Sequence, residues 1–147
     1  MKATIPNQPG SVSARNHTPT ETILVVDDYP ELCTIASLFL RRCGYRVLTA
    51  SNGEQAKQIA REHADIDLLL TDVEMPGMLG DKLADWFRVT RPNTAIVFMS
   101  GNPMQQRRLE PCHFVEKPFI HFDALRKTVH TALEEKRTTP ETTSAAA

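Results

Sequence analysis

Five polar side chains each stand where an apolar, strand-like run of the sequence ends: Asp27, Asp28, Asp72, Ser100 and Lys117. Carboxylates held close together repel one another and require a cation, and oxygen ligands suit a hard ion, Mg²⁺ above all. A protonated lysine cannot bind that metal, but it can neutralise an anion that the metal holds, and a serine hydroxyl can donate to the same anion. Together these groups are what a phosphoryl group needs while it is transferred.

Each of these residues also has an ordinary structural explanation when it is taken alone. Asp27-Asp28 could cap the helix that follows, which would be the favoured interpretation of that pair by itself. Asp72 could form a turn, Ser100 could be an N-cap and Lys117 could end a strand in solvent. These explanations do not account for four separate runs that place complementary chemistry at their ends.

The elements that must position these residues alternate between strand-like and helix-like segments. The run Leu68-Leu69-Leu70 has no polar face, which is typical of a strand buried on both faces of a parallel sheet. The second and fifth runs are mixed in polarity and are predicted at the sheet edges. The pattern therefore predicts an α/β fold: a single doubly wound, five-stranded parallel sheet in the flavodoxin-like order 2-1-3-4-5, with helices on both faces. The five predicted strands are Ile23–Val26, Tyr45–Thr49, Leu68–Asp72, Ala95–Met99 and His113–Lys117.

The predicted helices fill the gaps between these strands. The first opens at Pro30 and closes at Gly44, and a short one opens at Asn102-Pro103. The last is marked by apolar residues from Phe122 to Leu133. On the first helix the spacing predicts an apolar face made of Leu32, Ile35, Ala36, Phe39 and Cys43.

Composition divides the chain into one domain and two polar ends. Residues 22–135 hold the apolar runs, whereas 1–21 and 136–147 are rich in small polar residues and proline, and we expect a disordered leader and a disordered tail. The chain has 147 residues with 17 Lys+Arg against 18 Asp+Glu, which gives no electrostatic signature of nucleic acid or membrane binding. Neither a membrane span nor a signal peptide is evident, so we expect a cytoplasmic protein. Three cysteines without Cys-x-x-Cys spacing predict neither a disulfide framework nor a zinc site.

Four motifs in this sequence resemble the receiver domain of two-component response regulators, the CheY-like family. They occur in the order typical of that family, and the resemblance covers nearly all of residues 22–135. The motifs are Leu24–Asp28, Leu70–Gly77, Met99–Gly101 and Glu116–Phe119.

The resemblance implies a phosphoacceptor and a metal site. Asp72 matches the aspartate that accepts phosphate from the phosphohistidine of a histidine kinase or histidine phosphotransfer protein. Asp28, Asp72 and the backbone carbonyl of Glu74 match the ligands of a Mg²⁺ ion, and Asp27 matches the residue that usually acts through water. Lys117 matches the lysine that pairs with the phosphoryl group.

The resemblance also implies a switch. Ser100 matches the hydroxyl residue that follows the phosphoryl group, Phe114 matches the switch aromatic, and the Lys117–Pro118 peptide bond is similar to one that is cis in the family. The expected protein is a single-domain response regulator that is not an enzyme beyond its own phosphorylation and dephosphorylation, and that acts on an unknown downstream protein. One departure is that the segment between Ser100 and Lys117 is about one helical turn shorter than the family's usual fourth helix.

Four alternatives are weighed against this expectation. The chain could be a phosphorelay intermediate or the receiver module of a hybrid histidine kinase system, because these share the same site. An aspartyl-nucleophile phosphatase of the haloacid-dehalogenase type is less favoured, since that class has a second aspartate two residues after the nucleophile and this sequence has Glu74. A flavodoxin-like binding module is disfavoured because nothing resembles a flavin phosphate loop. A DNA-binding regulator is also disfavoured, because a polar tail follows Leu133.

Overall fold

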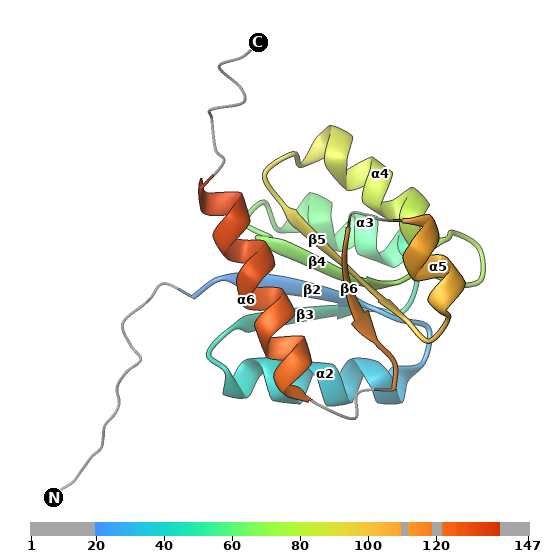
Figure 1. The fold of residues 1–147 in the computed structure, drawn as a ribbon. Helices are drawn as coiled ribbons and strands as arrows, with labels where there is room; N and C mark the ends of the chain where they lie inside the picture. The colour runs from blue at the N-terminus through green and yellow to red at the C-terminus, as the bar shows by residue number, and fades with distance from the viewer. Residues whose placement is uncertain (1–19, 110–111, 119–121, 139–147) are drawn as a thin grey trace, which may run out of the picture.

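A five-stranded sheet runs through the middle of the molecule, and every pair of neighbouring strands in it is parallel (Figure 1). The computed structural model describes residues 20–109, 112–118 and 122–138. The strand order is β3-β2-β4-β5-β6, which is the predicted order 2-1-3-4-5 with the two mixed strands at the edges. The strands are β2 (Thr22–Val26), β3 (Arg46–Ala50), β4 (Leu68–Asp72), β5 (Ala95–Ser100) and β6 (His113–Glu116).

Helices cover both faces of this sheet. Helices α2 and α6 pack on one face and α3 and α4 on the other, while the short α5 lies beside the β5–β6 end (Figure 1). The doubly wound architecture predicted from the alternation of strands and helices is therefore confirmed. The helices are α2 (Pro30–Arg42), α3 (Gly53–Glu62), α4 (Gly80–Thr90), α5 (Pro103–Arg108) and α6 (Phe122–Thr138).

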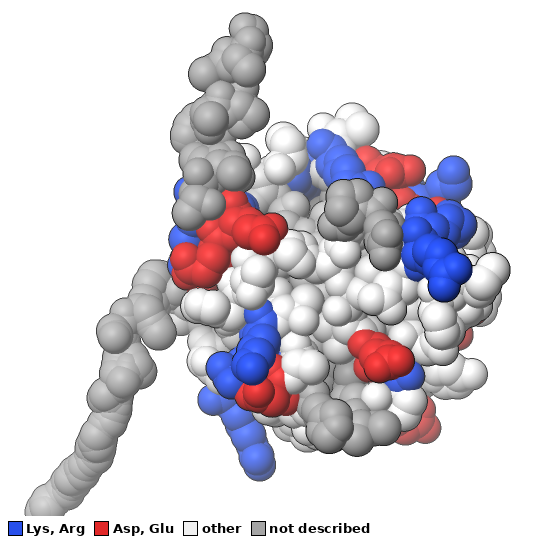
Figure 2. Space-filling model, in the orientation of Figure 1, with Lys and Arg blue, Asp and Glu red and all other residues white. Residues whose placement is uncertain are grey.

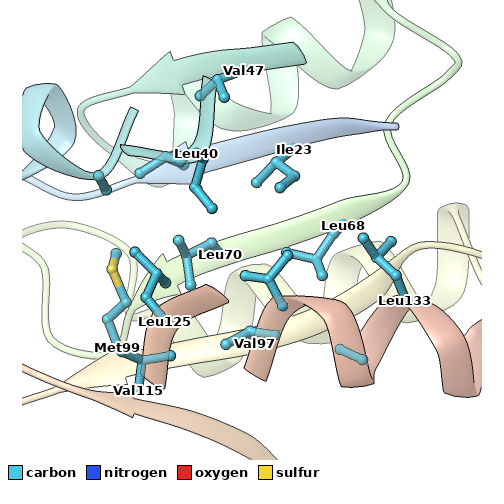
Figure 3. Close-up of a cluster of buried hydrophobic side chains, with 14 of the residues drawn as sticks. Ile23, Leu40, Val47, Leu68, Leu70, Val97, Met99, Val115, Leu125 and Leu133 are labelled. Carbon is cyan, nitrogen blue, oxygen red and sulfur yellow. The ribbon is translucent and has the colours of Figure 1, made fainter. Parts of the chain in front are cut away.

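The leucine run of β4 is apolar throughout because the strand is buried on both faces. Leu68 and Leu70 lie in the core beneath α2 and α6, among Leu125 and Leu133 (Figure 3). Leu69 points to the opposite face and packs against α3 and α4. Successive residues of a strand face opposite sides of the sheet, so a strand between two helical layers requires an apolar residue at every position.

The predicted apolar face of the first helix is confirmed at Ala36 and Phe39 and is wrong at Ile35. Helix α2 buries Cys33, Ala36, Ser37 and Leu40 against the sheet, whereas Ile35 is 42% exposed. Apolar residues surround most of this helix, so the 3.6-residue spacing fits more than one face. The face that docks includes two small residues, which allow the helix backbone to lie close to the strands.

The last helix continues beyond the predicted end of the domain at residue 135. Helix α6 runs to Thr138, and Lys136 forms an ion pair with Asp67 at 3.1 Å while Arg137 pairs with Glu21. Residues 136–138 are therefore helical rather than part of a disordered tail. The remainder of the predicted tail, residues 139–147, and residues 1–19 of the predicted leader lie outside the described residues, as does Phe119.

Charges of both signs are distributed around the rim of the face drawn in Figure 2, and the centre of that face is largely uncharged. Within the described residues, none of the helices is both long enough and apolar enough to cross a membrane.

Candidate functional site

Three carboxylates meet at the carboxyl edge of the sheet. Asp27 and Asp28 follow the end of β2, and Asp72 is the last residue of the neighbouring strand β4. The two strands run parallel in a register that pairs Val26 with Thr71, so they end at the same level. Each aspartate offers an oxygen that lies within 4.8 Å of the other two. The convergence that the sequence predicted for these residues is present.

Lys117 also lies at this carboxyl edge, although it follows the edge strand β6. Its backbone N–H donates to the carbonyl of Ser100 at the end of β5. The side chain then reaches back across the edge, with Nζ 3.1 Å from Asp27 Oδ2 and 3.2 Å from Asp72 Oδ1. The lysine side chain is only 14% exposed, so this is a shielded ion pair. The Lys117–Pro118 peptide bond is cis, as the family resemblance implied.

Burial dominates the acidity of the phosphoacceptor candidate. It raises the pKa of Asp72 from 3.8 to about 6; the Lys117 ammonium opposes this effect, and the Asp27 carboxylate reinforces it. Burial acts to lower the pKa of Lys117, but the Asp72 and Asp27 carboxylates outweigh it, so the lysine pKa lies above its ordinary 10.5. At neutral pH the lysine is therefore charged, and the mutually repelling carboxylates favour a further cation.

The donor set fits a magnesium ion. Asp28 Oδ1 is buried and has no hydrogen-bond partner within the described part of the chain, and a buried carboxylate oxygen without a partner is costly. Asp27 differs, because its Oδ1 accepts from the Tyr29 backbone N–H at 2.9 Å and its Oδ2 accepts from Lys117. Carboxylate oxygens are the ligands that Mg²⁺ prefers, and the orphaned oxygen of Asp28 is the one a metal would satisfy. Glu74 lies two residues after Asp72, and its exposed carboxylate accepts from Gln105, while the expected metal ligand is its backbone carbonyl.

The serine lies at the same edge but faces its own loop. Ser100 is 7% exposed, and its hydroxyl accepts from the Asn102 backbone N–H at 3.0 Å and lies 3.3 Å from the Asn102 carbonyl, to which it can donate. Phe114 is half-buried and packs on Phe98, with ring centroids 5.5 Å apart. The two candidate switch residues therefore come from neighbouring strands, β5 and β6.

Two residues at the site were not predicted from the sequence. Tyr29 donates its backbone N–H to Asp27, and its ring centroid lies 6.0 Å from Lys117 Nζ. Gln105 of α5 donates from Nε2 to the Glu74 carboxylate at 2.8 Å and so connects α5 to the loop after Asp72. The position of Tyr29 directly after the paired aspartates was an available signal, whereas the contact of Gln105 depends on packing that no sequence spacing reveals.

Comparison with known proteins agrees with this geometry. The family model for the response regulator receiver domain matches residues 23–130. The response regulator GtcR of Aneurinibacillus migulanus is 32% identical over 114 residues, which are 74% of this chain and 46% of that protein. This chain thus spans less than half the length of that relative.

Two solved structures share the fold over most of this chain. Response regulator TrrA of Thermotoga maritima, solved in complex with Mg²⁺-BeF, is 30% identical with a TM-score of 0.70, covering 77% of this chain and 99% of that one. The receiver domain of the hybrid histidine kinase CckA is 35% identical with a TM-score of 0.65, covering 76% and 98%. With a match that extends from the first strand into the last helix, the chain belongs to the family of response regulator receiver domains.

Proposed function

We propose that this chain accepts a phosphoryl group from a phosphohistidine onto Asp72, with Mg²⁺ bound beside it, in two-component signal transduction. The observation that carries the proposal is the meeting of the Asp27, Asp28 and Asp72 carboxylates within 4.8 Å, with Lys117 Nζ at 3.2 Å from Asp72. A nucleophile, a cation site and a neutralising ammonium are the parts that phosphoryl transfer requires.

The reaction forms one bond and breaks one. A carboxylate oxygen of Asp72 attacks the phosphorus, the P–N bond of the phosphohistidine breaks, and its electron pair stays on the imidazole nitrogen, which then takes up a proton. Asp72 must be ionised to act as nucleophile, and its pKa of about 6 allows this at neutral pH. Lys117, already 3.2 Å from Asp72 Oδ1, lies where it can balance the negative charge of the phosphoryl oxygens.

The residues that would hold the metal are Asp28, Asp72 and the backbone carbonyl of Glu74, with Asp27 contributing through water. When bound, Mg²⁺ supplies positive charge that offsets repulsion between the carboxylates and the incoming phosphoryl oxygens. Asp27 also fixes Lys117, since its Oδ2 accepts from Nζ at 3.1 Å.

The phosphorylated protein is a signalling state in this proposal. Ser100 would exchange its contact with the Asn102 backbone for one with the phosphoryl group, and Phe114 would move with it, which shifts an existing equilibrium. The surface changed in this way would be recognised by a downstream protein. We expect the conformational exchange of Phe114 in NMR spectra to differ between protein with and without beryllofluoride plus Mg²⁺. Equal exchange in the two samples would count against the switch.

Intact-protein mass spectrometry tests the phosphoacceptor. After incubation with acetyl phosphate and Mg²⁺, the wild type is expected to gain the mass of one phosphoryl group and Asp72→Asn to gain none. Asp28→Asn is the metal control: it keeps the acceptor, and its labelling is expected to need more Mg²⁺ than that of the wild type. Unchanged labelling of Asp72→Asn would overturn the assignment.

A relay role is the second candidate, and the similarity to the receiver domain of the hybrid histidine kinase CckA favours including it. A stand-alone regulator and a relay module have the same site. Transfer from phosphorylated wild type to a purified histidine phosphotransfer protein separates them, because only a relay module returns its phosphoryl group to a histidine at a rate comparable with loss to water.

We also propose that the protein turns over no external phosphate ester. Its acceptor sequence is Asp72-Val73-Glu74, without an aspartate two residues after the nucleophile. Multiple turnovers of p-nitrophenyl phosphate that disappear in Asp72→Asn would instead identify an aspartyl-nucleophile phosphatase.

A further inference from the structure

A second hollow lies next to the acidic site, between α2 and the turn that joins β3 to α3. Its volume is about 390 Å³, within the range of small-molecule sites. One wall comes from α2, through Thr34, Ser37 and Arg41, and the other from Ser51 and Gln55 beyond the end of β3. The cleft therefore stands at the carboxyl edge of the sheet, over the edge strand, in the region where open α/β sheets bind ligands.

The wall formed by α2 contains a buried hydroxyl without a partner. Ser37 is 3% exposed, lines the cleft, and its Oγ makes no hydrogen bond to any described residue. A buried polar group left unsatisfied is unfavourable by about 1–3 kcal/mol. On the opposite wall the backbone N–H and the hydroxyl of Ser51 are already paired, since both lie within 2.9 Å of Gln55 Oε1. The Ser37 hydroxyl is thus a buried group to which a bound molecule could supply a hydrogen-bond partner.

Of the two charged residues that line the cleft, only Arg41 forms no ion pair with another described residue. Among the described residues that line it, Arg41 carries the one positive charge and Asp27 the one negative charge. The Asp27 carboxylate is already matched by Lys117 Nζ at 3.1 Å and the Tyr29 N–H at 2.9 Å. Arg41 donates from Nη2 to the Val47 carbonyl at 3.1 Å, which holds the guanidinium across the gap between α2 and β3.

The rest of the lining is neutral and partly apolar. Leu38 and Pro30 supply hydrocarbon surface. The Cys33 thiol also lines the cleft, with Sγ 3.4 Å from the Asp27 carbonyl to which it donates.

From these groups we infer that the cleft binds a small organic carboxylate with an apolar body. The carboxylate would pair with the Arg41 guanidinium, which suits the fork geometry of that side chain. An oxygen of the ligand would accept from the Ser37 hydroxyl, and the apolar part would lie against Leu38 and Cys33. The site is separate from the phosphoacceptor chemistry, although the two share Asp27 as a wall.

A titration with benzoate, followed by amide ¹H–¹⁵N NMR spectra, tests the inference. Benzoate is expected to cause saturable shifts that cluster at Thr34, Ser37 and Ser51. Benzamide, which has the same shape without the charge, is expected to bind about tenfold more weakly or worse. The titration uses protein without phosphodonor or Mg²⁺, so its result is independent of whether Asp72 is phosphorylated.

Paired variants locate the binding site. Arg41→Gln is expected to weaken benzoate binding about tenfold. Arg42→Gln removes the same charge from the next position, which does not line the cleft, and is expected to bind like the wild type. Ser37→Val, which replaces the hydroxyl with methyl groups, is expected to weaken benzoate binding and serves as the test if Arg41→Gln does not fold. The inference is overturned if no saturable shifts appear up to about 50 mM benzoate, if benzamide binds equally well, or if Arg41→Gln or Ser37→Val binds like the wild type.

Discussion

Among single residues, Asp72 makes stability depend on pH. Its pKa is raised from 3.8 to about 6 by burial, so the folded metal-free protein holds this proton more tightly than the unfolded chain does. The resulting stabilisation is fully present below pH 3.8 and is lost as the pH rises through about 6. The neutral amide of Asp72→Asn does not ionise in this pH range, so the stability of this variant relative to the wild type should increase with pH, by up to about 3 kcal/mol.

Urea unfolding in the presence of a chelator at about pH 4.5 and about pH 7.5 measures this difference. The comparison between the two proteins removes the contribution of the other titrating groups, which both share. A difference in stability between Asp72→Asn and wild type that is the same at both pH values would show that Asp72 is not held in a burial-dominated environment.

Lys117 is the residue whose removal should leave the largest uncompensated charge. Its ammonium is the group within 3.2 Å of both Asp27 and Asp72, and removing one partner of a buried ion pair is strongly destabilising. We expect Lys117→Met to lower the free energy of unfolding by about 3 kcal/mol at neutral pH without metal. Added Mg²⁺ should restore part of this loss, because it supplies positive charge to the same carboxylates.

The matched control is Lys127→Met, since Lys127 is 71% exposed and pairs with Asp123 on the surface of α6. That variant should change stability by less than about 1 kcal/mol, and its stability should respond to Mg²⁺ as that of the wild type does. Equal losses in the two variants, measured by chemical denaturation, would contradict the buried-pair interpretation of Lys117.

At the level of elements, α4 is placed by a glycine. The Gly80 N–H donates to the Val73 carbonyl, and a Cβ at Gly80 would lie 2.0 Å from the Asp72 carbonyl oxygen. That oxygen belongs to the backbone and cannot move without displacing Asp72. We expect Gly80→Ala to lower stability by about 3 kcal/mol and to shift the NMR signals of the β4 end.

Gly44 provides a control with a different mechanism. It has φ +103 and open space where a Cβ would be, so Gly44→Ala tests only the left-handed backbone conformation, at about 1–2 kcal/mol. Chemical denaturation of both variants separates steric exclusion from conformational preference. If Gly80→Ala lost no more stability than Gly44→Ala, the close approach of α4 to β4 would not be a constraint.

The elements that could be predicted best from the sequence are those with a single physical explanation. Leu68–Leu70 cannot form a strand with one face in solvent, because all three residues are apolar. This run therefore predicted a strand buried on both faces, with Asp72 at its end. Helix α2 was harder, because apolar residues lie all around it and the docking face is chosen by the small side chains of Ala36 and Ser37. The spacing of apolar residues does not show which face of the helix docks, because docking depends on how closely the helix backbone can approach the sheet.

For the whole molecule, the strand order could be predicted because the two strands of mixed polarity mark the sheet edges, and the flavodoxin-like order places those two strands there. Once the order is known, the carboxyl ends of the strands must meet, and the aspartates and Lys117 come together as a consequence of topology. Contacts between surface side chains remote in sequence, away from the carboxyl edge of the sheet, were not predictable. The ion pair of Lys136 with Asp67 joins two exposed-looking residues that are 69 positions apart, and a composition rule assigned Lys136 to a disordered tail.

That ion pair gives a test of where the folded unit ends. Lys136 pairs with Asp67 at 3.1 Å, and Arg137 pairs with Glu21 just before β2, so the last turn of α6 connects two distant segments. A chain ending after Thr138 should be as stable as the full chain, whereas one ending after Glu135 should lose about 1 kcal/mol, since partly exposed ion pairs each contribute little. Because both pairs reach solvent, about 1 M NaCl should reduce the difference. Thermal and urea unfolding of the two truncated chains measures it, and equal stability would place the functional end of the domain at residue 135 despite the longer helix.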